Sequence, residues 1–91
     1  MSLKLEYYYV YMDNLKEIRP IGIVPTEEMA WTLVEKDINK KYEELKWMYK
    51  NDNMCRPKVF INNTLKTVYA IFDHNHHAEY YIELAPFYNT L

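Results

Sequence analysis

The longest regular pattern in the chain covers residues 26–50, which include no glycine or proline and repeat apolar residues every three or four positions. Such spacing returns to one side of a 3.6-residue period and predicts one long amphipathic helix. At about 1.5 Å of rise per residue the helix would be roughly 37 Å long. Its apolar stripe consists of Ala30, Trp31, Val34, Ile38, Tyr42, Leu45, Met48 and Tyr49.

Both ends of this helix carry recognisable signals. Thr26 is a good N-cap, and Glu27 and Glu28 place negative charge beside the unpaired N–H groups of the first turn. At the other end, residues 51–53 accept left-handed backbone conformations readily, and Pro57 prevents continuation. The sequence therefore predicts a helix that begins and ends close to the limits of the apolar pattern.

Trp47 does not belong to the apolar stripe. On a helical wheel it lies roughly 160° from the centre of the stripe, close to Met29 and Leu33. One interpretation is that the helix kinks near Asn39, or that residues 51–57 fold back over the ring. The other is that Trp47 is an exposed contact residue, since Trp is enriched at the energetic centres of protein interfaces.

Shorter segments on both sides of the helix are rich in β-branched and aromatic residues and predict strands at 4–13, 16–24, 58–61, 66–72 and 78–85. Pro20 makes the second of these an edge strand or a broken one, because proline has no N–H for the ladder. Gly22 predicts a bulge or a close backbone approach. Pro86 is expected to end the last strand.

The element order β-β-α-β-β-β, with connections of hairpin length, predicts an α+β fold. We expect one domain over residues 1–91, a two-layer sandwich in which one long helix packs on one face of an antiparallel sheet of about five strands. A single helix leaves the other face uncovered, and large exposed apolar patches usually mark association. Self-association through this face as a homodimer, or binding of a partner there, is therefore expected.

Composition narrows the function classes. Apolar residues make up 49% of the chain, but ten of them are tyrosines and the mean hydropathy is only −0.47. Each tyrosine hydroxyl needs a hydrogen-bond partner or water, so several rings are expected at the surface. A net charge of −2 argues against a protein built to neutralise the phosphates of nucleic acid, because such binding depends mainly on Lys and Arg contacts. The lack of an apolar run of about 20 residues predicts a cytoplasmic protein without a membrane span. Residues with AT-rich codons outnumber those with GC-rich codons, which indicates an AT-rich genome. A small chain without motifs from such a genome would suit a virus or a mobile element.

A cluster of potential metal ligands lies in residues 73–79, where His74, His76 and His77 accompany Asp73 and Glu79. Imidazole and carboxylate groups bind zinc and other divalent metals. However, neighbouring residues in a hairpin turn tend to point apart, and a solvated turn is the simpler interpretation. A metal- or small-ligand-binding protein is the first alternative function.

No nucleophile has a visible base, and one glycine cannot form a phosphate-binding loop. Neither an enzyme nor a cofactor is therefore expected. A Tyr-rich sheet face could stack the bases of single-stranded nucleic acid, which is the second alternative, although the surrounding charges are not basic.

The sequence thus favours a small non-enzymatic protein-interaction module, in its most specific form a virus- or mobile-element-encoded inhibitor or regulator of a host protein. Its partner would be another protein, a second copy of itself, or both. The expected partner-binding residues are Tyr8, Trp47, Tyr81, Phe87 and Tyr88.

Overall fold

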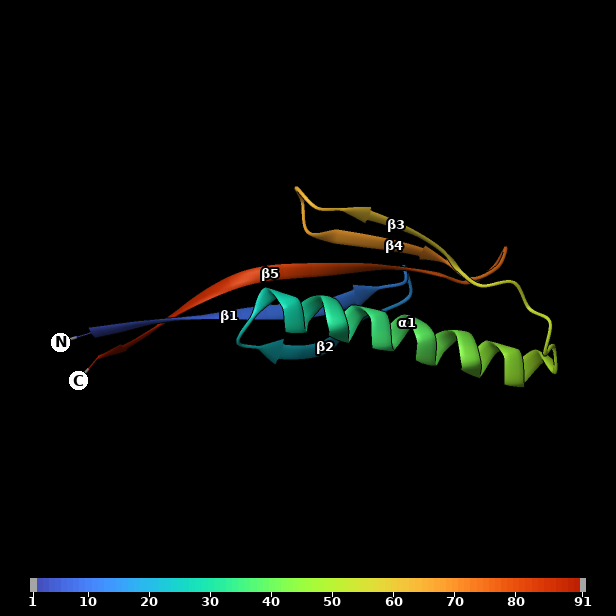
Figure 1. Ribbon diagram of the computed structural model, residues 1–91, viewed down its shortest axis with the longest axis horizontal. Coiled ribbons are helices and arrows are strands. Elements are labelled where there is room, and N and C mark those ends of the chain that lie inside the picture. Colours follow the sequence, from blue (N-terminus) through green and yellow to red (C-terminus); the bar gives the residue numbers. More distant parts are fainter. Residues whose placement is uncertain (1, 91) are drawn as a thin grey trace.

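A computed structural model describes residues 2–90, with side chains described for residues 6–85, and shows a five-stranded antiparallel sheet with one helix packed against it (Figure 1). The α+β two-layer fold predicted from the sequence is confirmed. The elements are β1 (Ser2–Asp13), β2 (Ile18–Val24), α1 (Glu27–Tyr49), β3 (Lys58–Asn62), β4 (Thr67–Ile71) and β5 (His77–Thr90), and the strands lie in the order β2-β1-β5-β4-β3.

The two longest strands, β1 and β5, form the middle of the sheet. They pair from Ser2 opposite Thr90 to Asp13 opposite Glu79. The flanking strands pair with only part of this length, β2 with β1 from Tyr8 onward and β4 with β5 as far as Tyr81. The remainder of β1 and β5 forms a two-stranded ribbon that carries both termini away from the helix (Figure 1), and the molecule measures 57 × 24 × 23 Å.

The prediction that Pro86 ends the last strand is wrong, because β5 continues to Thr90 with Pro86 opposite Glu6. Ile82 donates its backbone N–H to the carbonyl of Lys66, on the β4 side. Alternate residues of a strand direct their backbone groups to the same edge, so the nitrogen of Pro86 also points to that side. Pairing with β4 has already ended there, and a missing N–H on an open edge removes no ladder hydrogen bond.

The helix begins and ends close to the predicted residues. Thr26 caps it with a hydroxyl that accepts the N–H of Met29 at 3.2 Å. At the other end it is Lys50, one residue before the predicted asparagine cluster, that takes the left-handed conformation, with φ of 52°. Among the described residues, no helix is long and apolar enough to span a membrane.

The apolar stripe of α1 faces the sheet along most of its length. Its buried residues, Ala30, Val34, Ile38, Tyr42 and Leu45, pack with Val10, Met12, Val24, Val68, Ala70, Phe72, Ala78, Tyr80 and Ile82. The last turn differs from the prediction, because Met48 and Tyr49 are about half exposed. Figure 1 shows the reason, since the C-terminal end of α1 extends beyond the strands.

The expectation at Gly22 is confirmed in both forms. The β1–β2 register shifts beside Val10 and Gly22, so Ile21 is an extra residue and forms a bulge. A Cβ at Gly22 would lie 3.0 Å from Cδ1 of Leu33. Leu33, which the helical wheel places away from the stripe, is therefore half-buried, because β2 approaches the side of the helix.

A polar network fixes the helix over the β2 side of the sheet. The buried Tyr80 on β5 donates its hydroxyl to Oδ2 of Asp37 on α1 at 2.6 Å, and Arg19 on β2 contacts the same carboxylate at 3.1 Å. Burial and then the Asp37 carboxylate raise the pKa of Tyr80 above its ordinary value, which keeps the hydroxyl a donor. One residue from each of three elements therefore meets at Asp37.

We predict that Tyr80→Phe lowers the free energy of unfolding by about 1.5–3 kcal/mol, because a hydrogen bond to a shielded carboxylate is lost. Urea denaturation followed by circular dichroism measures the change. The control is Tyr69→Phe, which removes a hydroxyl from the more exposed ring of Tyr69 on the other sheet face. Equal losses in the two variants would show that the Asp37 network does not hold the helix.

Candidate functional site

The helix covers only part of its sheet face. It packs against β2, β1 and β5, while the β3–β4 hairpin lies to the side of it (Figure 1). The two β3 side chains that point toward the helix layer are consequently exposed, Val59 by 43% and Ile61 by 59%. Exposed aliphatic residues on the core-facing side of a strand indicate an incomplete layer.

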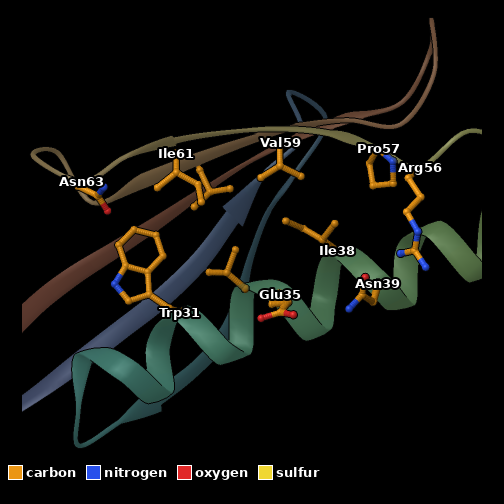
Figure 2. A pocket seen from close by; sticks show the side chains of 11 residues that line it. Trp31, Glu35, Ile38, Asn39, Arg56, Pro57, Val59, Ile61 and Asn63 are labelled. Atoms are coloured by element: carbon orange, nitrogen blue, oxygen red, sulfur yellow. The ribbon is translucent and has the colours of Figure 1, made fainter.

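An apolar groove occupies the space between α1 and β3. We call it the α1–β3 groove; its volume is about 530 Å³. Trp31 and Ile38 point into it from the helix, and Val59 and Ile61 face them from β3 (Figure 2). Val68, which is 2% exposed, lies at its floor on β4. This size and this lining are typical of a binding site for an apolar group.

Polar contacts tie the helix to the rest of the chain on both sides of the groove. On one side, Nζ of Lys66 lies 3.0 Å from Oε1 of Glu27 in the first turn of the helix. On the other, Tyr42 donates its hydroxyl to the carbonyl of Met54 at 2.6 Å, and the guanidinium of Arg56 lies 5.7 Å from the Tyr42 ring. These contacts link the helix to the start of β4 and to the segment that leads into β3, with the groove between them.

The polar side chains at the groove are of mixed type. Glu35 and Asn39 line it from the helix, while Arg56 and Asn63 lie at the two ends of the β3 segment (Figure 2). One carboxylate, one guanidinium and two amides can orient a ligand by hydrogen bonds. The arrangement therefore suits recognition of a mainly apolar ligand with polar flanks.

The second feature of this region is the open edge of the sheet. β3 is the outermost strand, and all five of its residues are exposed. Phe60, on the opposite face from Val59 and Ile61, is 57% exposed. Three consecutive apolar residues are thus presented to solvent on both faces of an edge strand, a composition that favours pairing with another chain.

The sheet face opposite the helix, called here the uncovered face, carries tyrosines next to carboxylates. The rings of Tyr11 and Tyr81 are stacked with centroids 4.9 Å apart, and Tyr11 donates its hydroxyl to Glu83 at 2.8 Å. Partial burial and then the Glu83 carboxylate raise the pKa of Tyr11 to about 12. Burial and the neighbouring Glu79 likewise raise the pKa of Tyr81.

The residues predicted to bind a partner do not form one surface. Trp47 is 83% exposed, so neither a kink nor residues 51–57 cover it. Tyr81 lies on the uncovered face, whereas Tyr8 is half-buried on the helix side, where it packs against the core. The backbones of Phe87 and Tyr88 belong to β5, and their side chains lie outside the described part of the chain.

The histidines of the 73–79 turn do not converge. His76 hydrogen-bonds to Asp73 at 2.9 Å and lies beside Tyr49, His77 lies in β5 next to Tyr69, and His74 is exposed. Burial opposes ionisation of Asp73, but hydrogen bonds from Asn75 and His76 hold the pKa of its carboxyl below the ordinary value. Among the side chains that the structure describes, those of residues 6–85, no three metal-ligating groups lie together as a metal would require.

The groove and the open edge were not predicted from the sequence. The helical spacing places Trp31 in the helix core, and the composition of residues 58–61 predicts only a short strand. The available signal was the run of Val59, Phe60 and Ile61 just before a turn, since three apolar neighbours in a strand leave no polar face. Which strand lies at the edge depends on pairing between distant segments, and no local pattern encodes it.

The comparisons with known proteins found no match: no protein-family model matches the chain, and no curated protein or solved structure is significantly similar to it.

We predict that Ile61→Ala changes the free energy of unfolding by less than about 0.5 kcal/mol, because Ile61 is largely exposed. Val68→Ala, at the floor of the same groove, should cost more than about 1 kcal/mol, since it removes buried methyl groups. Urea denaturation at low micromolar protein concentration compares the two. Similar costs would mean that Ile61 is packed and that the groove is closed in solution.

Proposed function

We propose that this chain is a small non-enzymatic protein-interaction module that receives an apolar segment of another protein in the α1–β3 groove. The observation that carries the proposal is the exposure of Val59 and Ile61 on the helix side of the sheet. Side chains in that layer are normally covered, and burying them would yield about 25 cal/mol per Å² of apolar surface.

Geometry supports a segment of protein as the ligand. Strands are about 4.8 Å apart and a helix with its side chains is about 10 Å wide. Because Val68 and Ala70 of β4 are already buried, the open strip lies over β3, and a helix placed on it would extend past the edge of the sheet. An amphipathic helix laid there would complete the second layer. Glu35 on one wall and Arg56 at one end could pair with charges on its flanks.

In its most specific form, the module is an inhibitor or regulator encoded by a virus or mobile element and acting in the host cytoplasm. The support for this form is compositional, namely the small size and the bias toward residues with AT-rich codons. Trp47 is exposed outside the groove, so it would have to contact a different part of the partner.

The two alternatives have less support. A nucleic-acid platform on the uncovered face is disfavoured because Glu83 and Glu79 lie beside the stacked Tyr11 and Tyr81, where they would repel phosphates. A metal site at the turn is disfavoured because Asp73 already holds His76 while His77 lies apart.

Site-specific photo-crosslinking tests the proposal. p-Benzoylphenylalanine is placed at Glu35, which lines the groove, and at Lys40, which lies on the other flank of the helix. After irradiation in an extract of the native or host cell, we expect a defined partner adduct from position 35 and none from position 40. Ile61→Lys, which puts a charge in the groove, should abolish the adduct.

Three outcomes would contradict the groove as the docking site. The first is equal labelling from Lys40. The second is an adduct at position 35 that survives Ile61→Lys. The third is an adduct that holds only the chain itself. Mass spectrometry of the adduct distinguishes these cases, and circular dichroism of each variant confirms that it is folded.

A further inference from the structure

The two outer edges of the sheet differ in how they are protected. The β2 edge carries Pro20, a bulge at Ile21 and the charged Arg19, all of which discourage another strand from pairing there. The β3 edge has none of these devices after Lys58. A sheet that blocks one edge and leaves the other regular and apolar is suited to pairing through the second.

The hydrogen-bond pattern shows which β3 groups are available. Ile82 donates its N–H to the carbonyl of Lys66, so these two residues form a hydrogen-bonded pair. Every second residue of β4, counted from Lys66, therefore directs its backbone groups to β5. The alternate residues, including Tyr69, must then face β3. Tyr69 is opposite Phe60, so Phe60 directs its backbone groups inward.

It follows that Val59 and Ile61 direct their backbone N–H and C=O groups to the open edge. No strand within residues 2–90 lies beyond β3. Two donors and two acceptors are therefore presented in a row by a strand whose side chains are mainly apolar. A strand that pairs here must match this spacing.

We propose that β3 pairs antiparallel with β3 of a second copy of this chain, with Phe60 on the two-fold axis. In that register Val59 lies opposite Ile61 of the second copy, and Ile61 opposite its Val59. Both pairs are hydrogen-bonded, so all four outward groups of each strand find partners. The sheets of the two copies become one sheet of ten strands.

Side chains are also matched in this register. The Phe60 rings of the two copies meet on the uncovered face, each beside the Tyr69 that is its own cross-strand neighbour. Lys58 lies opposite Asn62 of the second copy, so no like charges face each other. The strand is thus self-complementary in hydrogen bonds, apolar contact and charge.

Pairing on a two-fold axis perpendicular to the sheet places both helices on the same face. The two α1–β3 grooves then become a single trough, floored by the β4 and β3 strands of both copies. Each copy contributes one wall, formed by its helix with Trp31 and Ile38. This dimer goes beyond the proposed function. The β3 edge pairs through its backbone groups, and the side chains of the groove stay facing the trough, where they can still receive a different protein.

Disulfide trapping tests this register. Paired residues on the axis are not hydrogen-bonded to each other, and their Cα atoms should be about 4.5 Å apart, a distance that a disulfide can bridge. In a Cys55→Ser background, which removes the native thiol, Phe60→Cys should form a covalent dimer under mild oxidation with glutathione. Asn62→Cys is the control, since the two Asn62 residues would be roughly 13 Å apart.

Sedimentation equilibrium provides an independent readout that keeps Phe60. The unmodified chain should dimerise reversibly, whereas Val59→Pro should remain monomeric with an unchanged circular dichroism spectrum, because it removes an outward N–H and leaves the β4 ladder intact. A wild-type monomer at high micromolar concentration, or crosslinking of Asn62→Cys as efficient as that of Phe60→Cys, would overturn the proposal. Neither result would bear on the photo-crosslinking test of the groove, because that test detects a covalent adduct between this chain and a different protein.

Discussion

The width of one helix is the constraint on which the other features of this structure depend. A helix about 10 Å across covers two to three strands spaced about 4.8 Å apart, and this sheet has five. Because α1 lies over β2, β1 and β5, and Val68 and Ala70 of β4 are still buried beside it, the shortfall falls on β3. The exposed Val59 and Ile61, the groove and the regular apolar edge are consequences of that placement.

The position of the helix is itself specified by particular contacts. Asp37 accepts hydrogen bonds from Tyr80 and Arg19 and so anchors the middle of α1 over the β2 half of the sheet. Gly22 permits β2 to approach Leu33 closely. Lys66 forms a half-exposed ion pair with Glu27, which adds a weak link between the hairpin and the helix. Together these contacts keep the helix over the β2 half of the sheet. A shift of the helix toward β3 would close the groove.

Local patterns predicted most of the fold. The helix limits followed from Thr26 and from the apolar spacing, and the bulge followed from Gly22. The helical wheel placed Trp47 away from the stripe but left open whether its ring is covered, and the structure shows it exposed. Pro86 was misjudged because the effect of a proline depends on which edge its nitrogen faces. That direction is determined by the neighbouring strands.

The candidate site was less predictable for the same reason. The sequence indicated that some aromatic side chains would remain uncovered. In the structure, however, the tyrosines and Trp47 lie on different faces of the molecule and do not form one surface. The groove joins Trp31 to Ile61, and these residues are brought together only by the sheet order and by the offset of the helix. Tertiary arrangement, and not residue type, selects β3 as the open strand.

Amide hydrogen exchange of β3, resolved by NMR as a function of protein concentration, tests the central claim most directly. In dilute solution the Phe60 amide, which faces β4, should exchange slowly, whereas the amides of Val59 and Ile61 should exchange rapidly. Raising the concentration should slow exchange at Val59 and Ile61 specifically. Uniform protection of all three amides in dilute solution, or continued rapid exchange at Val59 and Ile61 at the highest concentration, would contradict the account.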